Sequence, residues 1–181
     1  MIRIVTLTPV DEGDLTFLTK ALYRQFGVGT EHLGDRPLPR GAEEDDGRHS
    51  APRLLELAPP VRAFADDKVL YVTNVELANP KGPLGEPPAW GHAVQGGDRA
   101  LVSTFRFRPR GALESSIEVF RRRLARESIH YLGHLWDLHH CYDPRCAMHP
   151  SWSPGLPDDP DYELDAFCRD KSDRIIRLAK T

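Results

Sequence analysis

The stretch "HYLGHLWDLHHC", residues 130–141, decides the fold and the chemistry that this sequence suggests. It places histidines at positions 130, 134 and 140, with an additional one at 139. Residues four apart on an α-helix lie about 40° from each other around its axis, so His130 and His134 project together. His140 reaches the same point only if the helix ends and the chain doubles back. Three histidines with a fourth position left to water form the open arrangement of a catalytic zinc ion.

The first two of these histidines lie near the end of a longer predicted helix, residues 112–138. Its apolar stripe has helical spacing and is expected to pack inward. The stripe consists of Ile117, Phe120, Leu124 and Ile129. The basic cluster "FRRRLAR", residues 120–126, is predicted to form the solvent-exposed face of this helix rather than a nucleic-acid site.

Strands and helices alternate along the rest of the chain, which favours an α/β (α+β) fold with helices packed on a sheet. Expected strands are residues 2–7, 68–75, 90–95 and 100–107, and further expected helices are 13–26, 51–64 with a break at Pro59–Pro60, and 163–179. Segments rich in Pro, Gly and charge predict loops at 35–50, 78–88 and 150–161. A chain of 181 residues without internal repeats is expected to form a single domain, residues 1–181.

The composition excludes several classes of function. The net charge is −3, with 40% hydrophobic and 28% charged residues, so neither a nucleic acid nor a membrane is expected as a partner. The first ten residues lack the apolar run of a signal peptide, and no run approaches the length needed to span a bilayer. We therefore expect a cytoplasmic protein.

The three cysteines, Cys141, Cys146 and Cys168, are odd in number and gathered in the last quarter of the chain. In a reducing compartment this favours metal ligation over disulfides. In "HCYDPRCAM", residues 140–148, two of them flank a four-residue turn, and Met148 follows two residues later. With the histidines, this pattern resembles the archaemetzincins, zinc metallopeptidases of the metzincin clan. Their signature is HExxHxxGxxHC, then four residues, CxM, a longer spacer and CxxC.

Upstream segments extend this resemblance over most of the chain, from Ile2 to about Cys168. They are "RHSAPRLL" (48–55), "DDKVLYVTNVEL" (66–77), and "WGHA" (90–93) followed by "ALVSTFRF" (100–107). The resemblance implies a compact metzincin-like domain with a mixed twisted sheet, an active-site helix carrying the HxxxH motif, and a Met-turn. The implied residues are His130, His134 and His140 for the catalytic zinc, Cys141, Cys146 and Cys168 for a second zinc, and Met148 for the Met-turn.

The first departure from the family pattern is Tyr131, which stands where the general-base glutamate is expected. That carboxylate takes a proton from zinc-bound water and hands it to the leaving amine. A phenol has an ordinary pKa of about 10 and is a poor base at neutral pH. Tyr131 is therefore interpreted as a packing or zinc-occluding residue. Glu127 faces the same side of the helix as His130 and is expected to hold a ligand imidazole in place, with a role as substitute base as the alternative.

Two further departures concern the geometry of the sites. Asp137 stands where the family has the turn glycine, and because Asp tolerates positive φ better than most residues, His140 is expected to remain a ligand, with His139 a bystander. The final motif reads "CRDK", which puts Lys171 where the fourth thiolate is expected. A charged lysine cannot bind zinc. His149 or Asp170 is left to complete the cysteine site, or the site holds three metal-free thiols.

Three functions are consistent with these residues. The first is a zinc-binding protein derived from a metallopeptidase, with lost or strongly reduced peptidase activity, which holds a peptide or protein segment in the former substrate cleft. The second is an active zinc hydrolase with an altered mechanism, in which Tyr131 or Glu127 assists zinc-bound water. The third is a structural zinc protein in which His139 or Tyr131 closes the fourth coordination position.

Overall fold

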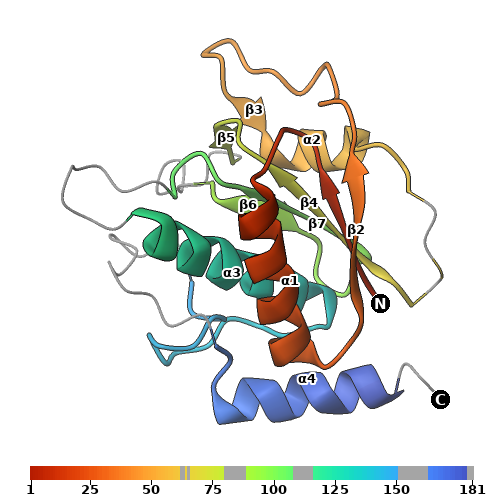
Figure 1. Ribbon diagram of the computed structural model, residues 1–181, viewed down its shortest axis with the longest axis vertical. Coiled ribbons are helices and arrows are strands. Elements are labelled where there is room, and N and C mark those ends of the chain that lie inside the picture. Colours follow the sequence, from red (N-terminus) through yellow and green to blue (C-terminus); the bar gives the residue numbers. More distant parts are fainter. Residues whose placement is uncertain (62–63, 65, 80–88, 108–115, 151–162, 179–181) are drawn as a thin grey trace.

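A five-stranded mixed sheet forms the centre of the protein, in a computed structural model that describes residues 1–61, 64, 66–79, 89–107, 116–150 and 163–178 (Figure 1). The strand order is β2 (Thr30–Asp35), β1 (Ile2–Thr6), β4 (Lys68–Thr73), β7 (Arg99–Ser103) and β6 (Gly91–Ala93). The first four strands in this order are parallel, whereas β6 runs antiparallel to β7 at one edge. Two short strands, β3 (His49–Ser50) and β5 (Leu77–Ala78), form a separate parallel pair.

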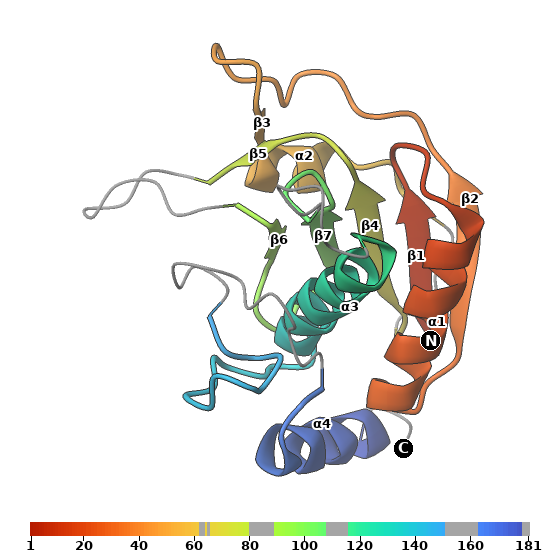
Figure 2. The same ribbon diagram turned by 60° about the vertical axis from the view of Figure 1, so that its left-hand side comes forward.

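Helices cover both faces of the sheet, which confirms the α/β class (Figure 2). Helices α1 (Glu12–Phe26) and α3 (Ser116–Leu135) pack against one face, and α4 (Ala166–Leu178) packs against α1. The opposite face is covered by α2 (Ala51–Leu57). Successive residues of a strand point to opposite faces, so Ile4 and Leu70 belong to the first core, and Val5 and Tyr71 to the second.

Most elements expected from the sequence are present, and most of them have shorter bounds. The start of the long helix and the loops at 78–88 and 150–161 lie wholly or largely outside the described residues. Strands β2, β3 and β5 were not predicted; β2 is a polar edge strand, "TEHLGD", and the other two have two residues each. Within the described segments, no helix combines the length and apolarity needed to cross a bilayer.

The basic segment of α3 does not behave as predicted. Arg123 and Arg126 are buried, because their guanidinium groups donate to backbone carbonyls, 3.0 Å to Phe107 and 3.0 Å to Cys146 respectively. Ile117, expected to pack inward, is 61% exposed. The prediction of a solvent-exposed basic face was therefore wrong for Arg123 and Arg126. These two side chains instead hold the backbone at Phe107 and at Cys146 against the helix.

Candidate metal centre

Helix α3 presents His130 and His134 one turn apart, and His140 follows the end of the helix. One ring nitrogen of each histidine can be chosen so that the three atoms all lie within 4.8 Å of one another. Leu132 and Leu135 alternate with the histidines and are buried in the core between the helix and the sheet. Burial of these leucines fixes the rotation of the helix, and the histidine face is thereby directed toward His140.

Backbone carbonyls select which nitrogens are available to a metal ion. The Nδ1 atom of His130 lies 2.9 Å from the Ala147 carbonyl, and that of His134 lies 2.8 Å from the Leu138 carbonyl. Each Nδ1 therefore carries the proton, which leaves Nε2 as the lone-pair donor. The two Nε2 atoms are 3.1 Å apart. Ligand nitrogens on a tetrahedral zinc ion with bonds of 2.0–2.1 Å lie about 3.3 Å apart, so the pair fits zinc without rearrangement.

The electrostatics of the cluster keep the imidazoles neutral. Burial, reinforced by His134, lowers the pKa of His130 to about 3. Burial also lowers the pKa values of His134 and His140. Only the neutral imidazole can bind a metal ion, so all three groups are in the ligating state at neutral pH.

The turn that carries His140 back toward the helix has the geometry expected at Asp137, whose φ is 57°. Beneath the helix, Met148 packs against Gly133 so closely that a Cβ atom on residue 133 would collide with the methionine sulfur. Both residues are buried. A glycine is thus required within the histidine motif because the buried methionine occupies the space of a side chain.

Tyr131 lies between the histidine cluster and the edge strand β6. Its ring makes an edge contact with His130, with centroids 5.2 Å apart, and it rests on Gly91, where a Cβ atom would lie 2.5 Å from the tyrosine ring. Burial, and then the charge of Glu127, raise the pKa of the Tyr131 phenol well above its ordinary value. The residue at the general-base position is consequently a neutral, protonated phenol.

Glu127 is fully buried on the same helix. The sequence suggested that it holds a ligand imidazole in place, but at His130 and His134 that position is filled by the carbonyls of Ala147 and Leu138. The charge of Glu127 raises the pKa of Tyr131, which is one way in which it acts on the candidate centre.

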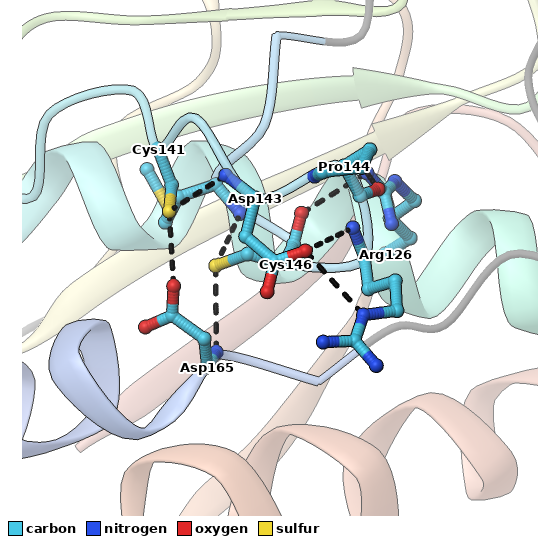
Figure 3. Close-up of polar contacts among 8 residues, drawn as sticks. Arg126, Cys141, Asp143, Pro144, Cys146 and Asp165 are labelled. Carbon is cyan, nitrogen blue, oxygen red and sulfur yellow. Dashed lines mark hydrogen bonds and ion pairs between the residues drawn. The ribbon is translucent and has the colours of Figure 1, made fainter.

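The three cysteines come together in a second group, and Asp165 joins them. Figure 3 shows Cys141, Cys146 and Asp165 of this group. The Cys141 thiol donates to Asp165 Oδ2 at 2.9 Å, and one ligand atom from each of the four residues lies within 4.8 Å of the others. The second carboxylate oxygen of Asp165 accepts from the Cys168 backbone N–H at 2.7 Å. Asp165 immediately precedes α4 and caps its N-terminus. Arg126 fixes the turn from below through the Cys146 carbonyl (Figure 3).

The cysteine group differs electrostatically from the histidine group. Burial and the hydrogen bond to Asp165 raise the pKa of Cys141 to about 11, and burial together with Cys146 raises that of Cys168. Burial alone would raise the pKa of Asp165, but hydrogen bonds from the Cys141 thiol and from Cys168 outweigh it and lower the pKa. Without metal, the group therefore holds protonated Cys141 and Cys168 thiols beside an ionised carboxylate.

Asp165 is the residue that the sequence interpretation missed. Neither His149 nor Asp170 belongs to the described metal-binding groups, and Asp170 pairs with Arg174 at 2.8 Å. An Asp at the N-cap position, three residues before Cys168, could have indicated this member of the group. The helix was predicted to begin at residue 163, so Asp165 was placed inside the helix instead of at its cap. Lys171 points elsewhere and donates to the Asp137 carbonyl at 2.9 Å.

Comparison with known proteins agrees with this geometry. The profile of peptidase family M54 matches residues 57–177. The chain belongs to the archaemetzincin family. Archaemetzincin of Pyrococcus furiosus is 30% identical over 160 residues, which cover 82% of this chain and 80% of the relative. Archaemetzincin of Methanocaldococcus jannaschii is 33% identical over 153 residues, with coverages of 82% and 80%.

Solved structures share the fold of this archaemetzincin. The crystal structure of archaemetzincin from Methanopyrus kandleri superposes with a TM-score of 0.80 at 23% identity, and covers 97% of this chain and 94% of its own. The zinc-dependent peptidase from Methanocorpusculum labreanum gives a TM-score of 0.76 at 19% identity, with coverages of 95% and 100%. The chain therefore belongs to a zinc metallopeptidase family, and the part of it that the structure describes contains two groups of residues that could hold a metal ion.

Proposed function

We propose that this archaemetzincin binds zinc through His130, His134 and His140 but has lost most or all of its peptidase activity. The observation that carries the proposal is Tyr131, whose ring packs between His130 and Gly91 at the position of the family's general base. Zinc at the three histidines would supply Lewis-acid chemistry through a coordination position left open to water or a peptide carbonyl. Among the described residues, no fourth protein ligand belongs to this group.

The reason for the loss is the absence of a proton acceptor at the reacting position. A general base needs a pKa near the working pH, so that it can take a proton and then release it to the leaving amine. The raised pKa of Tyr131 keeps the phenol protonated at neutral pH, so it can donate a hydrogen bond but cannot remove a proton. Loss of a general base reduces a rate about a hundred- to ten-thousandfold.

A zinc hydrolase with an altered mechanism is the second candidate, and Glu127 is the observation that favours it. This carboxylate is buried on α3 and is close enough to Tyr131 to raise its pKa. Such a mechanism would use Glu127 as the proton acceptor, with the Tyr131 phenol as a hydrogen-bond donor. A substitution of Glu127 therefore separates the two candidates.

We further propose that the cysteine group binds a second zinc ion with Asp165 as its fourth ligand. Carboxylate oxygen is an accepted zinc ligand alongside thiolate sulfur, and Asp165 already contacts Cys141 and Cys168. A site with four protein ligands is closed, so its role is to hold the 141–148 turn against α4. A stable 141–148 turn would also keep the Ala147 carbonyl in the position from which it orients His130.

The proposed role of the protein is to bind a peptide or protein segment in the former substrate cleft. In support, β6 is an edge strand beside the histidine cluster, and its Gly91 is in contact with Tyr131. An extended peptide can add to such an edge through backbone hydrogen bonds. Binding a peptide in this way would not require the general base that the site lacks.

The decisive experiment measures hydrolysis of a peptide library by zinc-loaded protein and its variants. We expect little or no turnover by the natural chain, and turnover at least about a hundredfold above it for Tyr131→Glu, because that substitution restores the carboxylate. Tyr131→Phe is the matched control and should leave turnover unchanged. Chelator-sensitive hydrolysis by the natural chain that is lost in Glu127→Gln would overturn the proposal in favour of the altered mechanism.

A further inference from the structure

The turn between His134 and His140 must hold a conformation that is unfavourable for its sequence. Helix α3 ends at Leu135, and the chain reverses at Asp137 with a φ of 57°, a region that non-glycine residues rarely occupy. The carbonyls of the last helical turn need partners outside the helix. Two of these partners come from the turn itself. The Asp137 amide donates to the His134 carbonyl at 3.0 Å, and the Leu138 amide donates to the Gly133 carbonyl at 3.0 Å.

The connection between β6 and β7 holds this turn from one side. The Gly96 amide donates to the His134 carbonyl at 2.8 Å. The side-chain amide of Gln95 donates both to Asp137 Oδ1 at 2.9 Å and to the Leu138 carbonyl at 3.2 Å. The Leu138 carbonyl is the same oxygen that orients the His134 ring. Gln95 therefore helps to fix the Leu138 carbonyl, which orients the proposed zinc ligand His134.

Lys171 holds the turn from the other side. It belongs to α4, one helical turn after Cys168, and its ammonium group donates to the Asp137 carbonyl at 2.9 Å. Position 171 is where the archaemetzincin pattern carries a cysteine, and position 137 is where it carries a glycine. The two departures from the pattern are thus in direct contact: the side chain that no longer serves the cysteine group binds the residue that replaced the turn glycine.

We propose that Lys171 and Gln95 are positioning residues for the histidine zinc site, which clamp the Asp137 turn so that His140 faces His130 and His134. This inference rests on the proposed zinc binding by the three histidines. The physical basis is that a non-glycine residue with positive φ needs external contacts to hold one conformation. Through Lys171, helix α4 joins the cysteine group to the turn of the histidine group, so a substitution on one site affects metal affinity at the other.

The test compares four single variants and one double variant of the full chain by cobalt(II) titration against a competing chelator. Cobalt bound to thiolates gives charge-transfer absorption, whereas cobalt at three histidines gives only visible ligand-field bands, so the two sites are followed separately. Lys171→Met removes the ammonium group and keeps the aliphatic stem; Lys171→Cys supplies the thiolate of the family pattern. Gln95→Ala removes the opposite half of the clamp. Arg174→Met is the matched control, because it removes a positive charge from the exposed surface of the same helix.

We expect Lys171→Met and Lys171→Cys each to weaken cobalt binding at the histidine site about tenfold, the lower end of the effect of losing a group that supports a metal ligand. Only Lys171→Cys should strengthen binding at the cysteine site. Gln95→Ala combined with Lys171→Met should cost less than the sum of the two changes, since both act on one turn. In metal-free protein, hydrogen exchange of the Asp137 and Leu138 amides should accelerate in Lys171→Met and remain unchanged in Arg174→Met.

Three results would overturn the inference. Unchanged histidine-site affinity in both Lys171 variants would refute it while leaving the proposed zinc site intact. An equal loss in Arg174→Met would show a general effect of charge on α4 rather than a clamp. Absence of histidine-site metal in the natural chain would refute the proposed zinc site itself, and the clamp with it.

Discussion

The histidine and cysteine groups adjoin in the sequence at residues 140 and 141, yet they have diverged in opposite ways. The histidine group keeps all three residues of its expected ligand set but has Tyr131 in place of the reacting carboxylate. The cysteine group has only three thiols, and Asp165 contributes a carboxylate in their midst. The histidine group thus keeps its expected residues and departs from the family pattern beside them, at position 131, whereas the cysteine group departs from the pattern in its own residues.

The difference follows from what holds each group in place. The helical histidines are oriented by carbonyls of Ala147 and Leu138, which do not depend on the side chain at position 131. The base could therefore be replaced without disturbing the ligand geometry. The cysteine group lies at the start of α4, where the helix requires a capping residue in any case. A capping carboxylate such as Asp165 is thus already close to the thiols when a thiolate is lost.

The largest expected effect separates the two groups by removing one ligand. His130→Ala should abolish zinc binding at the histidine site, because a buried ligand with both ring nitrogens engaged is removed, and should leave the cysteine site loaded. The measurement is the zinc-to-protein ratio after dialysis, which should fall by one equivalent. His139→Ala is the control: His139 is 73% exposed at its side chain and lies outside the histidine group, so the ratio should not change. Equal zinc content in His130→Ala and the natural chain would contradict zinc binding at the histidine site.

The next effect concerns pH. The pKa values of Cys141 and Cys168 are raised, so both thiols are protonated at neutral pH and must release their protons when metal binds. Each released proton makes the apparent affinity rise about tenfold per pH unit, so the protons of Cys141 and Cys168 alone should make the cysteine site bind at least about a hundredfold more tightly at pH 8 than at pH 7. The pKa of His130 is about 3 and those of His134 and His140 are lowered, so their site should change little over this range.

Cobalt titrations at several pH values measure both slopes in one sample. Asp165→Ala provides the control, because the pKa of this carboxylate is lowered and it is already ionised at neutral pH. That variant should weaken the cysteine site at every pH without flattening its slope. Equal slopes at the two sites would show that the thiols are not protonated in the metal-free protein.

The sequence predicted the grouping of the three histidines better than the grouping around the cysteines, for a physical reason. His130 and His134 share one face of one helix, so local geometry was sufficient for that pair. The return of His140 and the positive φ at Asp137 were expected from the resemblance to the archaemetzincins. Asp165 lies 24 residues from Cys141, and its contact with that thiol depends on how α4 packs. Tertiary packing likewise decided the burial of Arg126, since its carbonyl partners lie 18 and 20 residues away.

The same reasoning applies to the strands. β1 and β4 are almost continuously buried, and their apolar runs were recognised as strands from the sequence. β2 is the outermost strand of the sheet and is polar. Its extended conformation is stabilised by pairing with β1. Pairing of this kind leaves no periodicity in the sequence, so an exposed edge strand is the element that local patterns fail to indicate.

The smallest expected effect acts on both groups at once, through the contact of Gly133 with Met148. Met148 also links the cysteine turn, because its carbonyl accepts from the Cys141 amide at 2.9 Å. Gly133→Ala would force its new methyl group against the methionine sulfur, and overpacking of this kind destabilises a core by about 1–3 kcal/mol. Chemical denaturation of metal-free protein measures the change in the free energy of unfolding. Adding Met148→Ala should relieve the collision, so the double variant should be more stable than the sum of the two single changes predicts. Additive losses would mean that the two side chains do not compete for one space, and that the histidine and cysteine groups are independent at this contact.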